Sequence, residues 1–511
     1  MTPSENNKRI AKNTLMLYFR MLLIMGVSLF TVRVVLDTLG TIDYGIYNVV
    51  GGIVLMFSFL SGTMAAASQR FFAFELGRDN MEQLKKIFAI TMTIYAIIAI
   101  IIFALAETLG LWFLKHKMSI PPERMEATLW VYQFSILSFM MTLFTIPYNA
   151  AIIAHENMKI YAWVSIAEAL LKLIVIYLLV VFSVDKLKLY AVLMFGVTVF
   201  ITFIYRYYCS KKFEECRFSF YWEGSLFNEI IGFSGWNLFG SMAAVFKNQG
   251  INILLNIFFD PAINAARAIA YQVNSAIYQF VTNFSTAVNP QITKYYAGRQ
   301  KNQMVRLVFQ SSKFSYFLLF IFSIPILLET QFVLGLWLKE LPEYVVLFTR
   351  LVIINALVDS LVGPLVTSAL ATGRIKKYQI IVGGTMLLNL PISYFFLKLN
   401  FPPQTTMYIA IIIAIVNLGL RLILLKKMIQ FPTRSYIFDV IFKIIISSIL
   451  AYIIPLILMY KMEGGLVRFI FVTIISIIST VVVIYCVGLS GGERKIVLDF
   501  AKNKVNKGSS L

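Results

Sequence analysis

The chain has 511 residues, of which 59% are hydrophobic and 14% are charged. A soluble domain is about half apolar and about a quarter charged, and no folded globule buries this much apolar surface, so the composition excludes a soluble protein. The 45 Lys and Arg residues exceed the 25 Asp and Glu residues, and in a membrane protein such an excess indicates cytoplasmic loops beside anionic lipid rather than nucleic acid.

Few residues are available for a disulfide framework or a metal site. The three cysteines, Cys209, Cys216 and Cys486, form no close pair in the sequence, and there are two histidines. We therefore expect no disulfide, no metal and no cofactor. The polar N-terminus runs into an apolar stretch that is too long for the core of a signal peptide and is followed by no small-residue cleavage site. We expect the first helix to be the insertion signal.

Apolar stretches long enough to span a bilayer, about 17 to 25 residues each, recur along the chain with short polar breaks. They predict an all-α membrane protein of about fourteen transmembrane helices, with no room for a soluble domain. The expected spans are 12–36, 44–69, 87–114, 125–153, 160–182, 188–208, 229–258, 262–290, 305–330, 343–370, 378–398, 405–425, 437–460 and 465–488.

The basic residues concentrate in alternate loops. A cytoplasmic N-terminus places most of the Lys and Arg residues in cytoplasmic segments, as the positive-inside rule requires. Both termini are then cytoplasmic, and the outer loops are short. A membrane enzyme that acts on an extracytoplasmic glycan usually needs a sizeable outer loop, so the short loops indicate that the chain is not an enzyme.

The sequence matches itself at an offset of about 220 residues, as repeats in transporters do. Residues 77–88 and 298–309 both start with Gly-Arg and continue with a basic residue and a Phe at the same spacing. At one constant shift, Pro147, Lys159, Tyr161, Leu171 and Tyr177 match Pro364, Lys376, Tyr378, Leu388 and Tyr394.

These matches predict two six-helix lobes related by a pseudo-twofold axis along the membrane normal, with a cavity between them and two extra C-terminal helices. The expected boundaries are 1–210 for the N-terminal lobe, 211–430 for the C-terminal lobe, 431–488 for helices 13 and 14, and 489–511 for a cytoplasmic amphipathic tail.

Two short stretches carry a resemblance to a known family. The stretch from Arg33 through Leu39-Gly40-Thr41-Ile42-Asp43-Tyr44-Gly45-Ile46-Tyr47 resembles the turn between the first two helices of the polysaccharide flippases of the multidrug/oligosaccharidyl-lipid/polysaccharide exporter superfamily. Phe258-Phe259-Asp260-Pro261-Ala262 occupies the equivalent place in the second lobe. The resemblance implies export of undecaprenyl-pyrophosphate-linked oligosaccharide units, as for O-antigen or capsule, with lobes that alternate between inward-open and outward-open states.

Charged residues within the expected spans are the candidate site residues. A charge at the centre of a membrane helix costs about 2.5 to 3.5 kcal/mol on translocon scales, so each such residue is expected to face a cavity or a partner. Cations outnumber anions in this set, which comprises Arg20, Arg33, Glu107, Glu168, Lys172, Lys247, Arg267, Arg350, Asp359 and Lys443.

Three cations are the strongest candidates for binding an anionic head group: Lys172, Lys247 and Arg267. Lys172 lies near the middle of its span, but Glu168 is one helical turn before it, so an ion pair is the competing interpretation. Lys247 and Arg267 lie on the two helices that open the second lobe. A pyrophosphate that leaves water needs the charge-assisted hydrogen bonds that Lys and Arg provide.

Arg20 and Arg33 are further candidates for the same cationic cavity. They are thirteen residues apart, which places them about 220° apart around a helix, so at most one faces the cavity and the other extends toward the interface. Asp359 with Asn355 forms a polar spot that either couples transport to a proton or bonds to a neighbouring helix. Arg70 and Arg421, at the cytoplasmic ends of their spans, are expected to be interfacial anchors.

The stretch Leu489-Ser490-Gly491-Gly492-Glu493 is similar to the signature of ATP-binding-cassette ATPases. The chain has no Gly-rich phosphate loop, so we reject that interpretation and expect no ATP hydrolysis. Ser490 and Glu493 instead have the spacing of a capping box, which predicts a short amphipathic helix after them.

Other functions remain open. A flippase for lipid-linked peptidoglycan precursors is close to the first expectation. A cation-coupled drug antiporter would be expected to have acidic residues deep in a lobe. A polysaccharide polymerase or an acyltransferase belongs to a different class. The expected partners are the lipid-linked oligosaccharide, membrane lipids and the polysaccharide polymerase machinery. We expect a monomer in the bacterial inner membrane.

Overall fold

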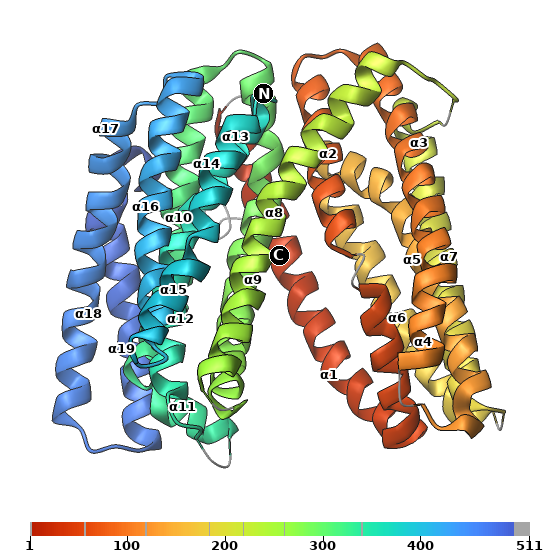
Figure 1. The fold of residues 1–511 in the computed structure, drawn as a ribbon. Coiled ribbons are helices and arrows are strands. Elements are labelled where there is room, and N and C mark those ends of the chain that lie inside the picture. The colour runs from red at the N-terminus through yellow and green to blue at the C-terminus, as the bar shows by residue number, and fades with distance from the viewer. Residues whose placement is uncertain are drawn as a thin grey trace, which may run out of the picture. The chain divides into compact units, whose positions relative to one another are not determined.

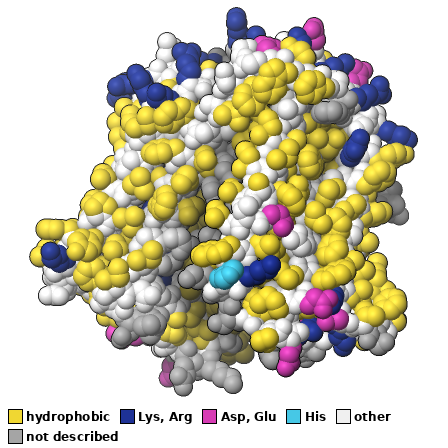
Figure 2. Space-filling view, turned by 45° about the vertical axis from the view of Figure 1, so that its right-hand side comes forward, with side chains coloured by type: hydrophobic (Ala, Val, Ile, Leu, Met, Phe, Trp, Pro, Cys, Tyr) yellow, Lys and Arg dark blue, Asp and Glu magenta, His cyan; other side chains and the backbone are white. Residues whose placement is uncertain are grey.

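The computed structural model describes residues 3–55, 58–117, 120–182, 184–217, 219–259, 261–338 and 341–494. These residues form helices joined by short turns, and they include no β-strand. Eleven of the described helical segments are long and apolar enough to cross a membrane. Hydrophobic side chains cover much of the surface seen in Figure 2, and Lys and Arg gather most densely at its upper end. The chain is therefore an all-α, multi-pass membrane protein.

The first half of the chain forms the helices that the apolar stretches predict, with ends within a few residues of the expected ones for most spans. They are α1 (Pro3–Leu55), α2 (Ser58–Gly77), α3 (Met81–Leu105), a π-helical turn (Ala106–Gly110), α4 (Leu111–Lys117), α5 (Met125–Ala154), α6 (Met158–Val181) and α7 (Lys186–Lys212).

The second half has longer and more polar helices at its start. They are α8 (Gly224–Phe258), α9 (Pro261–Ala297), α10 (Lys301–Leu328), α11 (Thr330–Trp337), α12 (Val345–Ser360), α13 (Val362–Ala371), α14 (Lys376–Leu387), α15 (Asn389–Lys398), α16 (Thr405–Ile429), α17 (Thr433–Tyr436), α18 (Lys443–Lys461) and α19 (Leu466–Val483), with π-helical turns at Ile437–Phe442 and Ile484–Gly488.

Helices α8 and α9 have 35 and 37 residues, which is more than enough to span a bilayer. Neither is among the eleven segments that are apolar enough to be recognised as spans. Their polarity is concentrated in Asn, Gln, Lys and Arg residues. Because lipid does not solvate such side chains, helices of this composition are expected to turn their polar faces toward protein or a water-filled cavity.

The long helix α1 is two helices joined at a kink. Gly40 has φ 78° and ψ 167°, a conformation essentially restricted to glycine. The sequence predicts a turn between the first two spans at this position, and the structure confirms it.

The described residues divide into two compact units. The N-terminal unit consists of residues 12–238. The C-terminal unit consists of residues 239–494 together with residues 3–11. Within each unit the helices run side by side (Figure 1).

In the N-terminal unit, α5 packs most extensively against α7 and α2. Its interior contains an aromatic group in which Phe88 contacts Phe72 and Tyr148, with ring centroids 5.8 and 5.5 Å apart. In the C-terminal unit, α9 packs against α10 and α12, while α19 packs against α18 and α10. The two extra C-terminal helices thus extend the core of this unit, with Ala451 and Val472 buried beside Leu319.

The internal repeat is visible in the turns of the two units. Asp79 and Arg299 both have positive φ, 56° and 57°. The turns around them share a hydrogen-bond pattern, in which Asn80 N donates to Glu75 O and Gln300 N donates to Tyr295 O.

A second pair of turns agrees in the same way. Glu156 and Gly373 have φ 59° and 74°, and each N–H donates to the carbonyl three residues earlier, Ile153 and Leu370. The second pair of turns has the offset of the sequence match, from Pro147 to Pro364. The first pair, Asp79 and Arg299, is shifted by one residue from the sequence match, which aligns Asp79 with Gln300. The repeat is therefore present in the local structure, and the structure corrects its register in the first segment.

Candidate functional site

Arg267 on α9 is the most deeply buried of the predicted site residues whose side chains the structure describes. Its side chain lies in the C-terminal unit, with the residue 4% exposed. Nη1 donates a hydrogen bond to Oδ1 of Asn252 on α8, and the guanidinium lies 4.5 Å from the ring centroid of Tyr271. Nε is buried and has no hydrogen-bond partner among the described residues. This cation is therefore held by a neutral amide and an aromatic ring, without a carboxylate at ion-pair distance in the described part of the chain.

Lys247 on α8 is partly buried. Within the described residues it has no carboxylate within ion-pair distance. Among the described residues, Asp359 and Arg267 are the charged groups near it, and they attract and repel it respectively. The two predicted cations of the C-terminal unit therefore share one electrostatic environment.

Asp359 on α12 is the acidic group of this region. Its Oδ2 accepts a hydrogen bond of 2.7 Å from Nδ2 of Asn355, one turn earlier on the same helix. The fields of Lys247 and Arg421 act on it. Asp359 and Asn355 are thus bonded to one another, as their spacing allows, and they lie near Lys247.

Arg421 on α16 extends this polar region. It is 5% exposed, its Nη1 donates to the Tyr378 hydroxyl, and its Nε has no partner among the described residues. Its expected role as an interfacial anchor is wrong, because the side chain turns into the helix bundle. Arg70 is also buried, with 8% of its surface exposed, and its guanidinium lies over the rings of Phe71 and Phe74. The expectation that Arg70 is an interfacial anchor is therefore wrong as well.

In the N-terminal unit, the predicted cation Lys172 has its own carboxylate. Nζ lies 2.6 Å from Oε1 of Glu168, and both side chains are more than a third exposed. The ion pair that the spacing allows is therefore present. Arg20 on α1 lies 4.6 Å from the ring centroid of Tyr161 on α6. The side chain of Arg33 lies outside the described residues.

One matched tyrosine in each repeat makes a cation–π contact with an arginine. Tyr161 and Tyr378 are matched in the sequence, and each lies beneath an arginine guanidinium of its own unit: Arg20 at 4.6 Å and Arg421 at 5.5 Å. Cation–π contact stabilises a guanidinium away from water. The sequence repeat could have identified Arg421 as a site residue through its tyrosine partner, whereas its position near a span end suggested an anchor.

The first family-like stretch takes part in a charge cluster at one end of the N-terminal unit. Arg124 donates to Asp43, with Nη2 2.5 Å from Oδ2, and to Asp185, with Nη1 2.9 Å from Oδ2. Asp185 also accepts from the backbone N–H groups of Leu187 and Lys188 at the start of α7. Burial alone would raise the pKa of the Asp185 carboxyl, but these hydrogen bonds hold the pKa below its usual value. The cluster ties the segment after the Gly40 kink to the beginnings of α5 and α7.

No protein-family profile and no curated protein sequence matches this chain. Solved structures do match it. The MATE transporter VcmN of Vibrio cholerae in the bent form aligns with a TM-score of 0.65 and 16% identity, over 85% of this chain and 98% of that chain.

Two further solved structures of transporters align with this chain over a similar share of its length. An outward-facing multidrug resistance MATE family transporter of the MOP superfamily aligns with a TM-score of 0.67 and 12% identity, over 82% of this chain and 96% of that one. The MATE transporter ClbM in complex with Rb+ aligns with a TM-score of 0.64 and 13% identity, over 81% and 94%. The chain has the fold of the MATE transporters.

Proposed function

We propose that this protein is an exporter that moves an undecaprenyl-pyrophosphate-linked oligosaccharide across the bacterial cytoplasmic membrane by alternating access. Its fold is that of transporters, which supports transport over an enzymatic role such as polymerase or acyltransferase. The lipid-linked oligosaccharide is what the resemblance of the stretches around Gly40 and Asp260 implies, and the cations of the chain support an anionic head group.

One observation carries the proposal: in the C-terminal unit, the buried Arg267 and the partly buried Lys247 have no carboxylate partner at ion-pair distance in the described residues. Arg267 bonds to the neutral Asn252, and Asp359 bonds to Asn355 instead of to Lys247 or Arg267. Burying an unpaired charge is costly, and an opposite charge supplied by a ligand removes that cost. A diphosphate is such a ligand, because it accepts several charge-assisted hydrogen bonds at once.

The neighbouring groups suit the rest of such a substrate. Asn252 and Asn355 have amide groups on the same helices as the charged residues, and Tyr271 lies beside Arg267. Amides bond to sugar hydroxyls, and aromatic faces stack on sugar rings. We assign Lys247 and Arg267 to the pyrophosphate and these groups to the saccharide.

The N-terminal unit contributes less to the anionic site in this proposal. Lys172 is neutralised by Glu168 at 2.6 Å, so it binds substrate only after that pair opens. Arg20, which has no carboxylate within ion-pair distance in the described residues and lies over Tyr161, is the better candidate there. Arg33 stays a candidate on its sequence position alone.

A cation-coupled drug antiporter is the second candidate. One structure with this fold is described as a multidrug resistance transporter, and another was solved with Rb+. The buried Asp359 carboxylate is a group through which a cation could be coupled. The excess of Lys247, Arg267 and Arg421 over Asp359 opposes it, because these charges repel a cationic drug.

The orientation belongs to the proposal as well. The positive-inside rule places both termini in the cytoplasm. The substrate would then enter from the leaflet on which lipid-linked sugars are assembled and leave on the outer side.

Deletion of the gene tests the proposed function. The expected result is accumulation of a lipid-linked oligosaccharide on the cytoplasmic side of the membrane and loss of surface polysaccharide. Accumulation of lipid-linked peptidoglycan precursor would identify the related flippase instead. Drug sensitivity with normal lipid-linked intermediates would contradict the proposal and support the antiporter.

A further inference from the structure

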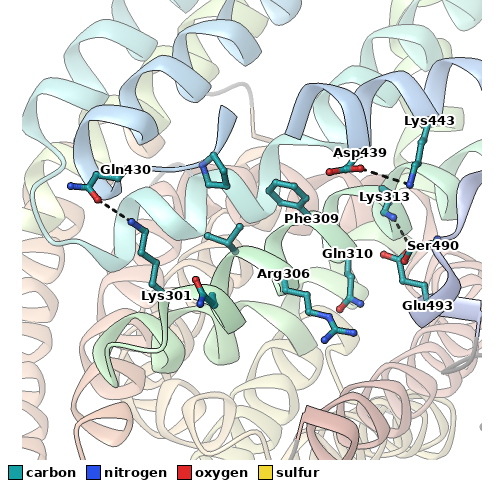
Figure 3. A pocket seen from close by; sticks show the side chains of 13 residues that line it. Lys301, Arg306, Phe309, Gln310, Lys313, Gln430, Asp439, Lys443, Ser490 and Glu493 are labelled. Carbon is teal, nitrogen blue, oxygen red and sulfur yellow. Dashed lines mark hydrogen bonds and ion pairs between the residues drawn. The ribbon is translucent and has the colours of Figure 1, made fainter. Parts of the chain in front are cut away.

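A polar cavity lies at one membrane end of the C-terminal unit, apart from the cluster around Arg267. Its volume is about 560 Å³, and it is bounded by the start of α10, the end of α16, the π-helical turn before α18 and the segment after α19 (Figure 3). These are the ends of four expected spans, on the side that the positive-inside rule assigns to the cytoplasm. The cavity therefore lies at the level of the lipid head groups.

The charges of this cavity are mostly positive, and two of them neutralise one another. Lys313 and Glu493 form an ion pair of 2.6 Å, with each side chain 4% exposed. This buried pair lines the cavity, and because its two charges neutralise one another, Lys313 is not available to bind an anionic ligand.

The remaining cations are only weakly engaged. Lys443 lies 3.9 Å from Asp439, and Lys301 donates to the neutral Gln430 at 3.2 Å. Arg306, which is exposed, has no hydrogen bond or ion pair in the described part of the chain (Figure 3). Two cations, Lys301 and Arg306, are thus without a carboxylate partner there.

The internal repeat shows that the cation at this position has a carboxylate partner in the N-terminal unit but not in the C-terminal unit. On α3, Lys86 lies 3.3 Å from Glu82, four residues earlier. When the turn at Asp79 is aligned with the turn at Arg299, Lys86 corresponds to Arg306 and Glu82 corresponds to Asn302. The repeat in the C-terminal unit therefore keeps the cation and lacks the carboxylate that neutralises it.

We propose that this cavity binds the phosphodiester head group of an anionic phospholipid of the cytoplasmic leaflet, with Arg306 as the main ligand and Lys301 and Lys443 beside it. The surroundings favour a lipid over free phosphate. Phe438 and Phe442, on the turn that carries Asp439, are 56% and 54% exposed, which provides an apolar surface for acyl chains beside the cationic cavity.

The remainder of the chain does not fit the cavity as an occupant. Beyond the described residues, it contains Lys495, Lys502, Lys504 and Lys507 against the single acidic residue Asp499. A basic segment would be repelled by Arg306 and Lys301, and it would add to the attraction for anionic lipid.

Native mass spectrometry of the full-length protein in detergent, with dioleoylphosphatidylglycerol or dioleoylphosphatidylcholine added, tests this proposal. The wild type is expected to retain the anionic lipid in preference to the zwitterionic one. Arg306→Gln is expected to reduce retention about fivefold, because one basic residue near an anionic surface contributes at about this level. The matched control is Lys86→Gln, which removes the corresponding cation of α3 that already has a carboxylate.

Asn302→Glu is the second variant, since it gives Arg306 a carboxylate one turn away and leaves the packing unchanged. It is expected to reduce retention as Arg306→Gln does. Equal retention of phosphatidylglycerol by the wild type, Arg306→Gln and Asn302→Glu would overturn the proposal. Displacement of the lipid by inorganic phosphate at millimolar concentration would overturn it too, because the site would then bind free phosphate.

Discussion

Arg267 illustrates how far a single residue can be interpreted from the sequence. Its position inside an expected span predicts a costly charge that needs a partner. The structure supplies Asn252 and Tyr271 as neighbours. These partners lie on α8 and α9, so the contacts depend on how two long polar helices pack, which hydropathy does not specify. Lys172 differs, because its partner Glu168 is on the same helix and its ion pair follows from spacing alone.

Gly40 provides a test at the residue scale. A Cβ added there would meet nothing within 4 Å, so the effect of Gly40→Ala comes from its φ of 78° alone. Forcing alanine into this conformation is expected to cost about 1 to 3 kcal/mol. Thermal unfolding in detergent measures this, with Gly62→Ala as the control. Gly62 lies within a helix, also with nothing near its Cβ, and alanine there is expected to be neutral or stabilising. An equal, small effect of both changes would contradict the assigned kink.

Asp185 gives a pH-dependent prediction. Its pKa is lowered in the folded protein, so its contribution to stability is present above its ordinary pKa and is lost as the pH falls through the folded-state value. Asp185→Asn is expected to lower the melting temperature at neutral pH and to flatten its decline below about pH 4. Thermal unfolding from neutral to acidic pH measures both. Parallel curves for the wild type and the variant would show that Arg124 does not stabilise this carboxylate.

At the scale of elements, most helices were predictable because a bilayer demands long apolar segments whose polar breaks are easily recognised. The turn at Gly40 lies in one of these breaks, and the turns that contain Asp79 and Arg299 were indicated by the internal repeat, one residue out of register. The partners of buried charges across helices were not. Lys313 lies early in its expected span, where a lysine is compatible with the interface, and Glu493 is 180 residues away in a stretch predicted to be a capping box. Half of that box is present, since Ser490 N donates to the Glu493 carboxylate at 2.8 Å.

Two ion pairs attach the last helices to α10 and the turn that follows it. Arg468 near the start of α19 lies 2.6 Å from Glu329, and Glu493 after its end lies 2.6 Å from Lys313. Lys313→Met is expected to destabilise the protein by about 3 to 5 kcal/mol, because it leaves Glu493 buried without a partner.

The double variant Lys313→Met with Glu493→Met is expected to be much closer to the wild type, since no unpaired charge remains. Thermal unfolding of both single variants and the double variant gives the coupling energy between the two side chains. Additive losses in the double variant would show that the pair does not attach this segment.

At the scale of the whole molecule, the orientation follows from charge counting and not from the packing. Cysteines placed one at a time at Asp79 and Arg299 are expected to resist labelling by a membrane-impermeant thiol reagent in intact cells, because both turns are assigned to the cytoplasm. Cysteine at Lys186, between two outer span ends, is expected to react and serves as the positive control. Labelling at positions 79 and 299 with protection at 186 would reverse the topology and the side on which substrate enters.

The expected boundary between the lobes at residues 210 and 211 stays a prediction. Along the chain, the N-terminal compact unit ends at Leu238 and the C-terminal one continues from Phe239, both within α8. Helix composition predicts spans well, but it contains little information on which spans pack together. The assignment of α8 to a unit depends on contacts such as that of Phe71 with Phe233, whose ring centroids are 5.5 Å apart.

The central claim is that Lys247 and Arg267 bind the anionic head group of the exported lipid. Its most direct test is export of surface polysaccharide by cells that carry Lys247→Ala, Arg267→Ala or Arg267→Lys in place of the wild type, with membrane abundance measured in parallel. Arg374→Ala, in an exposed turn, is the charge-matched control. The account predicts that both alanine variants are inserted and abundant but export no polymer, that Arg267→Lys keeps part of the activity because the charge remains, and that the control exports normally. Normal export by the alanine variants at wild-type abundance would contradict it.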